Sequence, residues 1–490
     1  MTTTRTRGGR RISRQALVVA GTAATLGILY GYDQSNVGGA QLFFERDLGL
    51  SSSQVEYVTA GIVWGELAGA VVGGWVANKI GRRLSVILVT VGYVFGCVLS
   101  ALAQNAGQLF AARVLLGFAV GISIVVVPVF VAESVPAGIR GAMLVLYQVV
   151  TVVGVLLGYL VALTLVGSGT EFSSSADVFG TGNWRLMLGV AAVPALVLLP
   201  FVLRLPDTPR WYAMKGRWDE ARALLQRVDP DADHDAEIAE MRSALSEETG
   251  GAWGQMLRKP YLRATVFVVV LGFFIQITGI NATVTYGPRI FEAMGVESDE
   301  QKLLMAGLVQ LIALVAVITS LTLIDRIGRR PILLTGIGIM IVAQLMLVVT
   351  FLIVGDGEFG GFTIALGFAG LALINVGFVF GFGSLVWVYA GEAFPARLRA
   401  YGASAMLTAD LVANLIIAQF FLTVMGTLGG AGSFGLFAFF AVLAWLFVFR
   451  FAPETKGRDV DAIQHYWTNG GRWPDEEPSV AASDAPAGRS

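Results

Sequence analysis

Twelve long apolar segments restrict what this chain can fold into. Each has about 20 mostly apolar residues, the length that an α-helix needs to cross the hydrocarbon core of a bilayer. A segment in that environment has to pair its backbone N–H and C=O groups internally, which helices and closed barrels achieve. The segments are residues 15–38, 55–77, 84–104, 108–132, 142–166, 186–205, 264–287, 303–324, 331–354, 362–391, 401–425 and 432–451. The sequence therefore predicts an all-α membrane protein with twelve transmembrane helices.

The composition agrees with this class and offers little for enzyme chemistry. Of the 490 residues, 55% are hydrophobic and 14% are charged, whereas a soluble domain has about 25% charged residues. The single cysteine, Cys97, allows no internal disulfide, and His234 and His465 form no metal or nucleophile constellation. There is no phosphate-binding GxxxxGK motif, and the net charge of −1 does not favour nucleic acid. We expect neither an enzyme nor a bound cofactor or metal.

The distribution of basic residues predicts the orientation in the membrane. Loops on the side of the amino terminus hold 29 of the 34 lysines and arginines, and such an excess marks the cytoplasmic side. One arginine, Arg113, falls inside a span, and the opposite loops hold Arg46, Arg185, Arg289 and Lys302. We expect both termini to be cytoplasmic and the protein to lie in the plasma (inner) membrane among its lipids.

An internal repeat divides the chain into two halves of six helices. NKIGRR at 78–83 recurs 247 residues later as DRIGRR at 325–330. Parallel repeats of this kind are typical of transporters whose substrate site lies between the halves; two structural bundles without a cavity are the alternative. The predicted regions are a basic amino terminus (1–14), the first bundle (15–205), a linker of short amphipathic surface helices (206–263), the second bundle (264–451) and a cytoplasmic tail (452–490) that is largely disordered after 470.

Several motifs, in order along the spans, carry a family resemblance. They are GGWVANKIGRR and its copy DRIGRRP, the pattern from Arg113 through Gly141, PDTPR after the sixth span, IQITGINATVTYGP in the seventh, and PETKG at 453–457. Together they resemble the sugar porter family of the major facilitator superfamily, and most of all its bacterial sugar/proton symporters. The resemblance implies import of a monosaccharide or polyol by a monomer that alternates access between its halves, with the proton as coupling ion.

Three other functions compete with this interpretation. A uniporter needs no ionisable residue in the first helix. A non-transporting sugar sensor usually carries a long cytoplasmic extension, whereas only some 34 residues follow Lys456. A drug exporter is disfavoured by PETKG, PDTPR and the glutamines and asparagines within the spans.

An acid inside the first span is the strongest functional signal. Asp33 lies in the apolar run around GYDQSN, and a carboxylate at the bilayer centre costs about 2.5–3.5 kcal/mol on insertion scales. The resemblance pairs Asp33 with Arg113 and implies that Asp33 carries the proton. A permanent structural salt bridge is the alternative.

Polar residues within the spans are candidates for substrate contact. The resemblance assigns sugar contacts or cavity positions to most of them, and for Asn414 an interhelical hydrogen bond is an equal alternative. Asp410 is either a second titrating group or a charge facing the aqueous cavity. The candidates are Gln148, Gln276, Asn281, Trp387, Tyr30, Gly383, Asn414 and Asp410.

The sequence also departs from the family at five positions. Ile275, Ser384, Val155 and the pair Asp410-Leu411 replace family residues. A pentose, a polyol such as inositol or a less polar solute therefore remains open beside an aldohexose.

Charged residues near the cytoplasmic ends of the spans are candidate gates. The resemblance implies that glutamates and arginines pair across the halves when the cytoplasmic side is shut, with Tyr286 at the outer gate. The alternative is that the basic residues only determine topology. The candidates are Tyr286, Glu133, Arg140, Glu392, Arg399, Arg82, Arg83, Asp325, Arg329 and Arg330.

Overall fold

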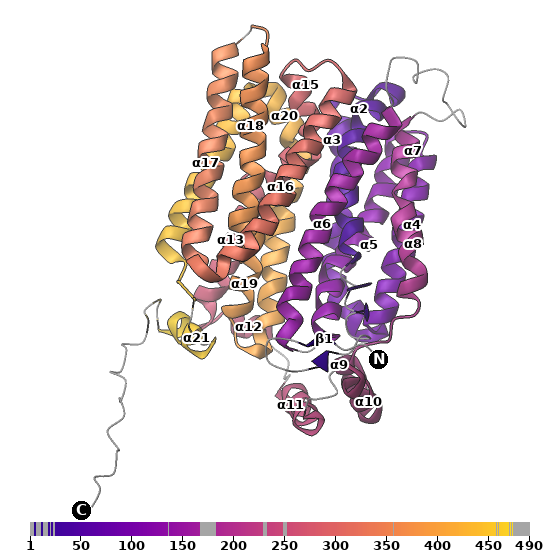
Figure 1. Ribbon diagram of the computed structural model, residues 1–490, viewed down its shortest axis with the longest axis vertical. Coiled ribbons are helices and arrows are strands. Elements are labelled where there is room, and N and C mark those ends of the chain that lie inside the picture. Colours follow the sequence, from indigo (N-terminus) through magenta and orange to yellow (C-terminus); the bar gives the residue numbers. More distant parts are fainter. Residues whose placement is uncertain are drawn as a thin grey trace, which may run out of the picture.

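The molecule is a bundle of long helices that run side by side (Figure 1). The computed structural model describes residues 25–135, 137–166, 183–228, 233–247, 252–355 and 357–456, with short pieces at 4–5, 11–12, 18–19, 21–22, 458, 460–469, 471 and 473. Within these residues the β-structure is one antiparallel pairing of Thr4–Arg5 with Arg11–Ile12.

The first half contains seven described helices. They are α2 (Gly27–Leu48), α3 (Ser52–Ile80), α4 (Arg82–Leu102), α5 (Ala106–Glu133), α6 (Ala137–Val166), α7 (Asn183–Val190) and α8 (Ala192–Val202). The consecutive helices α7 and α8 form one candidate span, Trp184–Val202. In Figure 1 this half occupies the right-hand side of the bundle.

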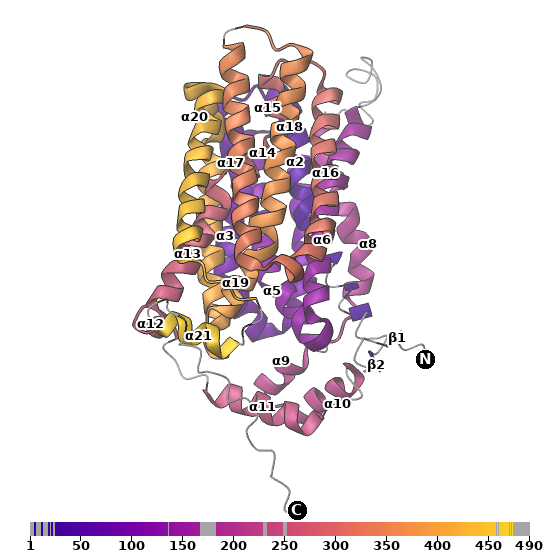
Figure 2. The same ribbon diagram turned by 60° about the vertical axis from the view of Figure 1, so that its left-hand side comes forward.

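The second half lies beside the first and contains more broken helices (Figures 1 and 2). Its members are α13 (Leu262–Ile277), α14 (Ile280–Thr285), α15 (Gly287–Ala293), α16 (Asp299–Ile327), α17 (Arg329–Val354), α18 (Gly361–Phe378), the π-helix η1 (Val379–Gly383), α19 (Ser384–Glu392) and α20 (Ala396–Phe451). Within α20, Gly429 has φ 67° and ψ 179°, so two helices meet there.

The number of spans agrees with the prediction. Ten described helices are long and apolar enough to cross a membrane. One of them, Leu398–Phe451, would be about 80 Å long as a straight helix, far more than a bilayer, and it divides at Gly429. Counting its two parts separately and adding α2 gives twelve, so the predicted all-α fold is confirmed.

Short helices mark one end of the bundle, which we call the linker end (Figure 2). They are α9 (Pro209–Met214), α10 (Trp218–Val228), α11 (His234–Glu247) and α12 (Ala252–Met256), together with α21 (Val460–Thr468). The sequence did not predict α21. It is held because Trp467, only 5% exposed, packs with its ring centroid 4.8 Å from that of Phe267. Residues from 474 onward, where disorder was predicted, lie outside the described residues.

Helix α2 extends beyond the end of the first predicted span. The sequence placed its end at residue 38, whereas α2 continues to Leu48. Hydropathy ends where charged residues begin, but those residues make protein contacts: Arg46 pairs with Asp299 at 2.7 Å, and Asp47 accepts a hydrogen bond from Trp184 at 2.8 Å. The helix therefore continues in contact with protein beyond its apolar segment.

Glycines allow the helices that carry the site to approach closely. A Cβ atom on Gly117 of α5 would lie 1.9 Å from the Ile62 carbonyl oxygen of α3, and one on Gly31 of α2 would lie 1.8 Å from the Thr151 oxygen of α6. Small residues are what transmembrane helices use for such contacts. These contacts fix α5 against α3 and α2 against α6, and they hold Arg113 and Asp33 in the interior.

Candidate functional site

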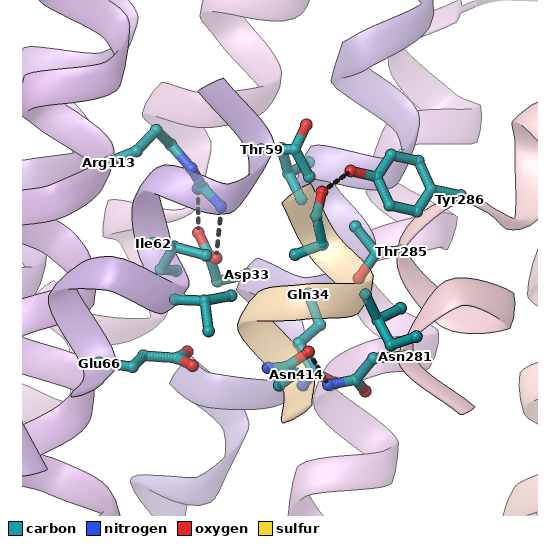
Figure 3. A pocket seen from close by; sticks show the side chains of 14 residues that line it. Asp33, Gln34, Thr59, Ile62, Glu66, Arg113, Asn281, Thr285, Tyr286 and Asn414 are labelled. Atoms are coloured by element: carbon teal, nitrogen blue, oxygen red, sulfur yellow. Dashed lines mark hydrogen bonds and ion pairs between the residues drawn. The ribbon is translucent and has the colours of Figure 1, made fainter. Parts of the chain in front are cut away.

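A pocket lies between the two halves of the bundle (Figure 3). It has about 410 Å³ of empty space, part of it open to solvent. Helices α2, α3 and α5 contribute its wall in the first half, and α14, α20 and the segment around Tyr286 contribute its wall in the second. The lining residues are Asp33, Gln34, Val37, Thr59, Ile62, Val63, Glu66, Arg113, Asn281, Thr285, Tyr286, Asn414, Ile417 and Ala418.

Asp33 and Arg113 form a buried ion pair in this pocket. Arg113 Nη1 donates to Asp33 Oδ1 at 2.7 Å and Nη2 donates to Oδ2 at 3.0 Å. Asp33 is 2% exposed and Arg113 is 0% exposed. Such two-point pairing fixes both groups and is stronger than a single hydrogen bond. The structure thus brings together the two residues that the resemblance pairs.

A break in the seventh span brings Asn281 into the pocket. Helix α13 ends at Ile277, Gly279 adopts the left-handed conformation with φ 90°, and α14 begins at Ile280. Gln344 Nε2 donates to the freed Thr278 carbonyl at 2.8 Å, so the break is stabilised. Asn281 Nδ2 then donates to Asn414 Oδ1 at 2.8 Å. The two amides form a polar pair facing the pocket, and they come from α14 and α20.

Tyr286 forms part of the same wall. Its hydroxyl donates to the Ala418 carbonyl at 2.6 Å, and its ring stacks on Phe421 with centroids 5.2 Å apart. The side chain is 0% exposed. Tyr286 is therefore packed within the second half in this structure.

The other predicted substrate residues do not line this pocket. Tyr30 is connected to it, because Gln34 Nε2 donates to the Tyr30 hydroxyl at 2.9 Å. Gln276 interacts with Asp410, one turn before Asn414 on α20. The remaining three candidates lie nearer to the linker end than the pocket residues do. They are Gln148 on α6, which is partly buried, Gly383 at the end of η1, and Trp387 on α19, which is 47% exposed.

Four polar residues of the pocket were missed by the sequence analysis. They are Gln34, Thr59, Glu66 and Thr285. Glu66 had a signal of the same kind as Asp33, since it is an acid inside the apolar run IVWGELAGA. The other three carry no charge, and a single hydroxyl or amide in a span is too common to be diagnostic.

Hydrogen bonds and ion pairs seal the two halves at the end opposite the linker. Arg289 pairs with Glu45 and also donates to the Gln41 carbonyl at 3.0 Å. Glu56 of α3 accepts hydrogen bonds from the backbone N–H and the hydroxyl of Thr423, both at 2.6 Å. These contacts join residues far apart in the sequence, and they close the pocket toward that end.

At the linker end, Glu133 pairs within its own half. Arg82 Nε lies 3.1 Å from Glu133 Oε2, and Arg210 Nε lies 4.0 Å from Oε1. Thr208 Oγ1 also donates to Glu133 Oε2 at 2.6 Å. Arg83 donates to the Leu203 carbonyl at 2.9 Å. Within the described part of the chain, these predicted gate residues therefore make their contacts within the first half and with the start of the linker, and not with the second half.

The corresponding residues of the second half behave in the same way. The backbone N–H groups of Arg329 and Arg330 donate to Glu454 at 3.1 and 3.0 Å. Glu392 lies within electrostatic range of Arg329 and of the exposed Arg399, both from its own half. The side chains of Arg140 and Asp325, also predicted as gates, lie outside the described residues.

Among the residues that the structure describes, no group of three histidine, cysteine or acidic side chains is arranged to hold a metal ion. The predicted absence of a cofactor stays a prediction.

Comparisons with known proteins agree with the fold and the motifs. A family model described as "Sugar (and other) transporter" matches residues 19–467. The galactose-proton symporter of Escherichia coli is 34% identical over 460 residues, which is 93% of this chain and 95% of the relative. A probable polyol transporter of Arabidopsis thaliana is 32% identical, with 92% of this chain and 94% of the relative covered.

Solved structures resemble the chain in fold. The partially occluded inward-open conformation of the xylose transporter XylE from E. coli matches with a TM-score of 0.78 at 23% identity, covering 91% of this chain and 100% of that one. The resemblance deduced from the motifs is confirmed. The chain is a multi-pass membrane protein that belongs to the family of sugar (and other) transporters.

Proposed function

We propose that the protein imports a monosaccharide or polyol by proton symport across the plasma (inner) membrane, as a monomer with both termini in the cytoplasm. One observation carries the proposal: the bidentate ion pair of Asp33 and Arg113, buried in a pocket between the halves. The relatives support the substrate class, since they include a galactose-proton symporter, an arabinose-proton symporter and polyol transporters.

The ion pair provides a way to couple a proton to the substrate. Burial disfavours a charged carboxylate, whereas a neighbouring arginine favours it. Asp33 therefore holds a proton when it is separated from Arg113 and releases the proton when the pair forms. A movement of α2 relative to α5 that depends on bound substrate would link proton release to transport.

The contacts at the two ends support alternating access. The pocket is sealed at the end opposite the linker by Arg289–Glu45 and Glu56–Thr423, while Glu133 pairs inside its own half at the linker end. This is the arrangement expected of a molecule facing the cytoplasm. In the outward-facing form we propose that Glu133 and Glu392 pair with arginines of the other half and that the outer contacts separate.

The proposed substrate site extends from the pocket toward the linker end. Asn281 and Asn414 offer amide groups in the wall of the pocket. Gln276, Gln148 and Trp387 do not line the pocket, and in this proposal they supply further hydrogen-bonding groups and an aromatic face on the linker side of it. A neutral polyhydroxylated solute needs such directional groups with apolar surface between them.

Transport by purified protein in liposomes tests the proposal. A panel of radiolabelled hexoses, pentoses and polyols is offered with and without an inward proton gradient. We expect at least one solute to accumulate above its external concentration only when the gradient is present. Uptake that merely equilibrates under both conditions would favour the uniporter, and no uptake of any panel member would contradict the proposal.

A further inference from the structure

Glu66 is a buried acid of the pocket for which the proposed mechanism has no use. It lies on α3, is 3% exposed, and its Oε2 has no hydrogen-bond partner among the described residues. Figure 3 shows its side chain extended toward the interior of the pocket. A carboxylate without a partner at this depth is costly, because it has lost water and gained nothing in exchange.

A second acid on the same helix shows how this fold normally satisfies a buried carboxylate. Glu56, ten residues earlier on α3, is 1% exposed and accepts two hydrogen bonds of 2.6 Å from Thr423. The two glutamates thus share a helix and a degree of burial, but only one is paired. The difference leaves Glu66 Oε2 available for a hydrogen-bond donor that the described residues do not supply.

The charges around Glu66 show what kind of partner it requires. Arg113 is the one basic residue among those lining the pocket, and both of its Nη atoms are already bound to Asp33. Asp410, from the other half, lies within electrostatic range of Glu66. Beside the Asp33–Arg113 pair, two further acids, Glu66 and Asp410, therefore lie here with no basic side chain of the pocket left to pair with them. The local field therefore favours a positively charged ligand.

We propose that the substrate is a polyhydroxylated compound with a cationic amine, such as an amino sugar or an aminocyclitol, whose ammonium group binds Glu66. An ammonium group supplies three hydrogen-bond donors and a positive charge, which match an unpartnered carboxylate oxygen. Asp410, on α20 of the other half and behind the pocket lining, strengthens the attraction, and the hydroxyl groups of the substrate bind Asn281 and Asn414. This inference rests on the proposed transport function and specifies its substrate class.

Matched pairs of ligands test this inference. Binding of glucosamine and glucose, galactosamine and galactose, and an aminocyclitol and inositol is measured at neutral pH by competition in counterflow exchange. N-acetylglucosamine serves as the uncharged control. We expect each amine to bind about tenfold or more tightly than the matching neutral compound, since one charge-assisted hydrogen bond changes a binding constant by roughly that factor. The acetylated sugar should lose this preference.

Variants then assign the preference to Glu66. Glu66→Gln keeps the shape and removes the charge, so the amine preference should fall to about twofold or less, whereas Glu66→Asp should retain part of it. Glu240→Gln, on the exposed face of α11, is the matched control and should change nothing. An unchanged preference in Glu66→Gln would overturn the inference.

The outcomes also separate this inference from the proposed function. Proton-driven uptake of neutral sugars, with no preference for their amines in the wild-type protein, would refute the amine site and leave symport intact. Such a result would mean that Glu66 is satisfied by a proton. If Glu66→Gln fails to fold, the comparison of matched ligands on the wild-type protein still shows whether the site prefers an amine.

Discussion

Replacing both members of the Asp33–Arg113 pair, singly and together, separates a coupling role from a structural one. Arg113→Gln leaves Asp33 buried at 2% exposure without its two hydrogen bonds of 2.7 and 3.0 Å. Removing one partner of a buried ion pair costs about 3–5 kcal/mol, because the other charge remains uncompensated. The double variant Asp33→Asn with Arg113→Gln removes both charges of the pair, so it should be more stable than Arg113→Gln alone.

The assay combines thermal unfolding in detergent with counterflow exchange in liposomes. The effects of the two single substitutions on the free energy of unfolding should differ from additivity by about 0.5–3 kcal/mol, the usual range for residues in direct contact. Asp33→Asn should retain counterflow, since exchange needs substrate binding but no proton movement, and should lose accumulation driven by a pH gradient. Additive effects on stability would contradict the ion pair itself, and loss of counterflow together with accumulation would favour a purely structural salt bridge.

Further predictions concern the substrate site and the gates. Gln276→Ala and Asn281→Ala should each weaken binding of the best substrate by about 1–3 kcal/mol, the cost of an unmet buried hydrogen bond. Unchanged affinities in competition assays would show that the substrate does not bind at these residues. Arg289→Ala should weaken the seal opposite the linker and shift the population outward, read as longer distances between spin labels at that end. Glu392→Gln should shift the population inward, and unchanged distances at the linker end would remove it from the gate. Asp410→Asn with the wild-type substrate range and pH profile would show that Asp410 does not titrate during transport.

The sequence predicted the features that depend on long-range composition and on single charges in apolar surroundings. The twelve spans follow from hydropathy, and the division of α20 at Gly429 follows from the break between the last two apolar segments. Asp33 and Arg113 are visible because a charge in a span has to be compensated. Their pairing came from the resemblance, since 80 residues separate them.

The sequence could not predict features that depend on packing or on conformational state. The end of α2 was placed too early because hydropathy registers lipid contact and not contacts such as Arg46 with Asp299. The bond between Glu56 and Thr423 joins residues 367 positions apart, and it depends on how closely the two halves approach at that end. Glu66 carried the same signal as Asp33 but matched no motif of the resemblance, so its burial emerged only from the structure.

Direct observation of proton movement tests the central claim. Liposomes that contain the protein and an entrapped pH indicator are exposed to an external substrate without any imposed pH gradient. A symporter carries protons inward with the substrate, so the lumen of wild-type vesicles should acidify, whereas vesicles with Asp33→Asn should take up substrate without acidification. Substrate uptake by the wild-type protein with no change in lumenal pH, or equal acidification by Asp33→Asn, would contradict proton coupling through Asp33.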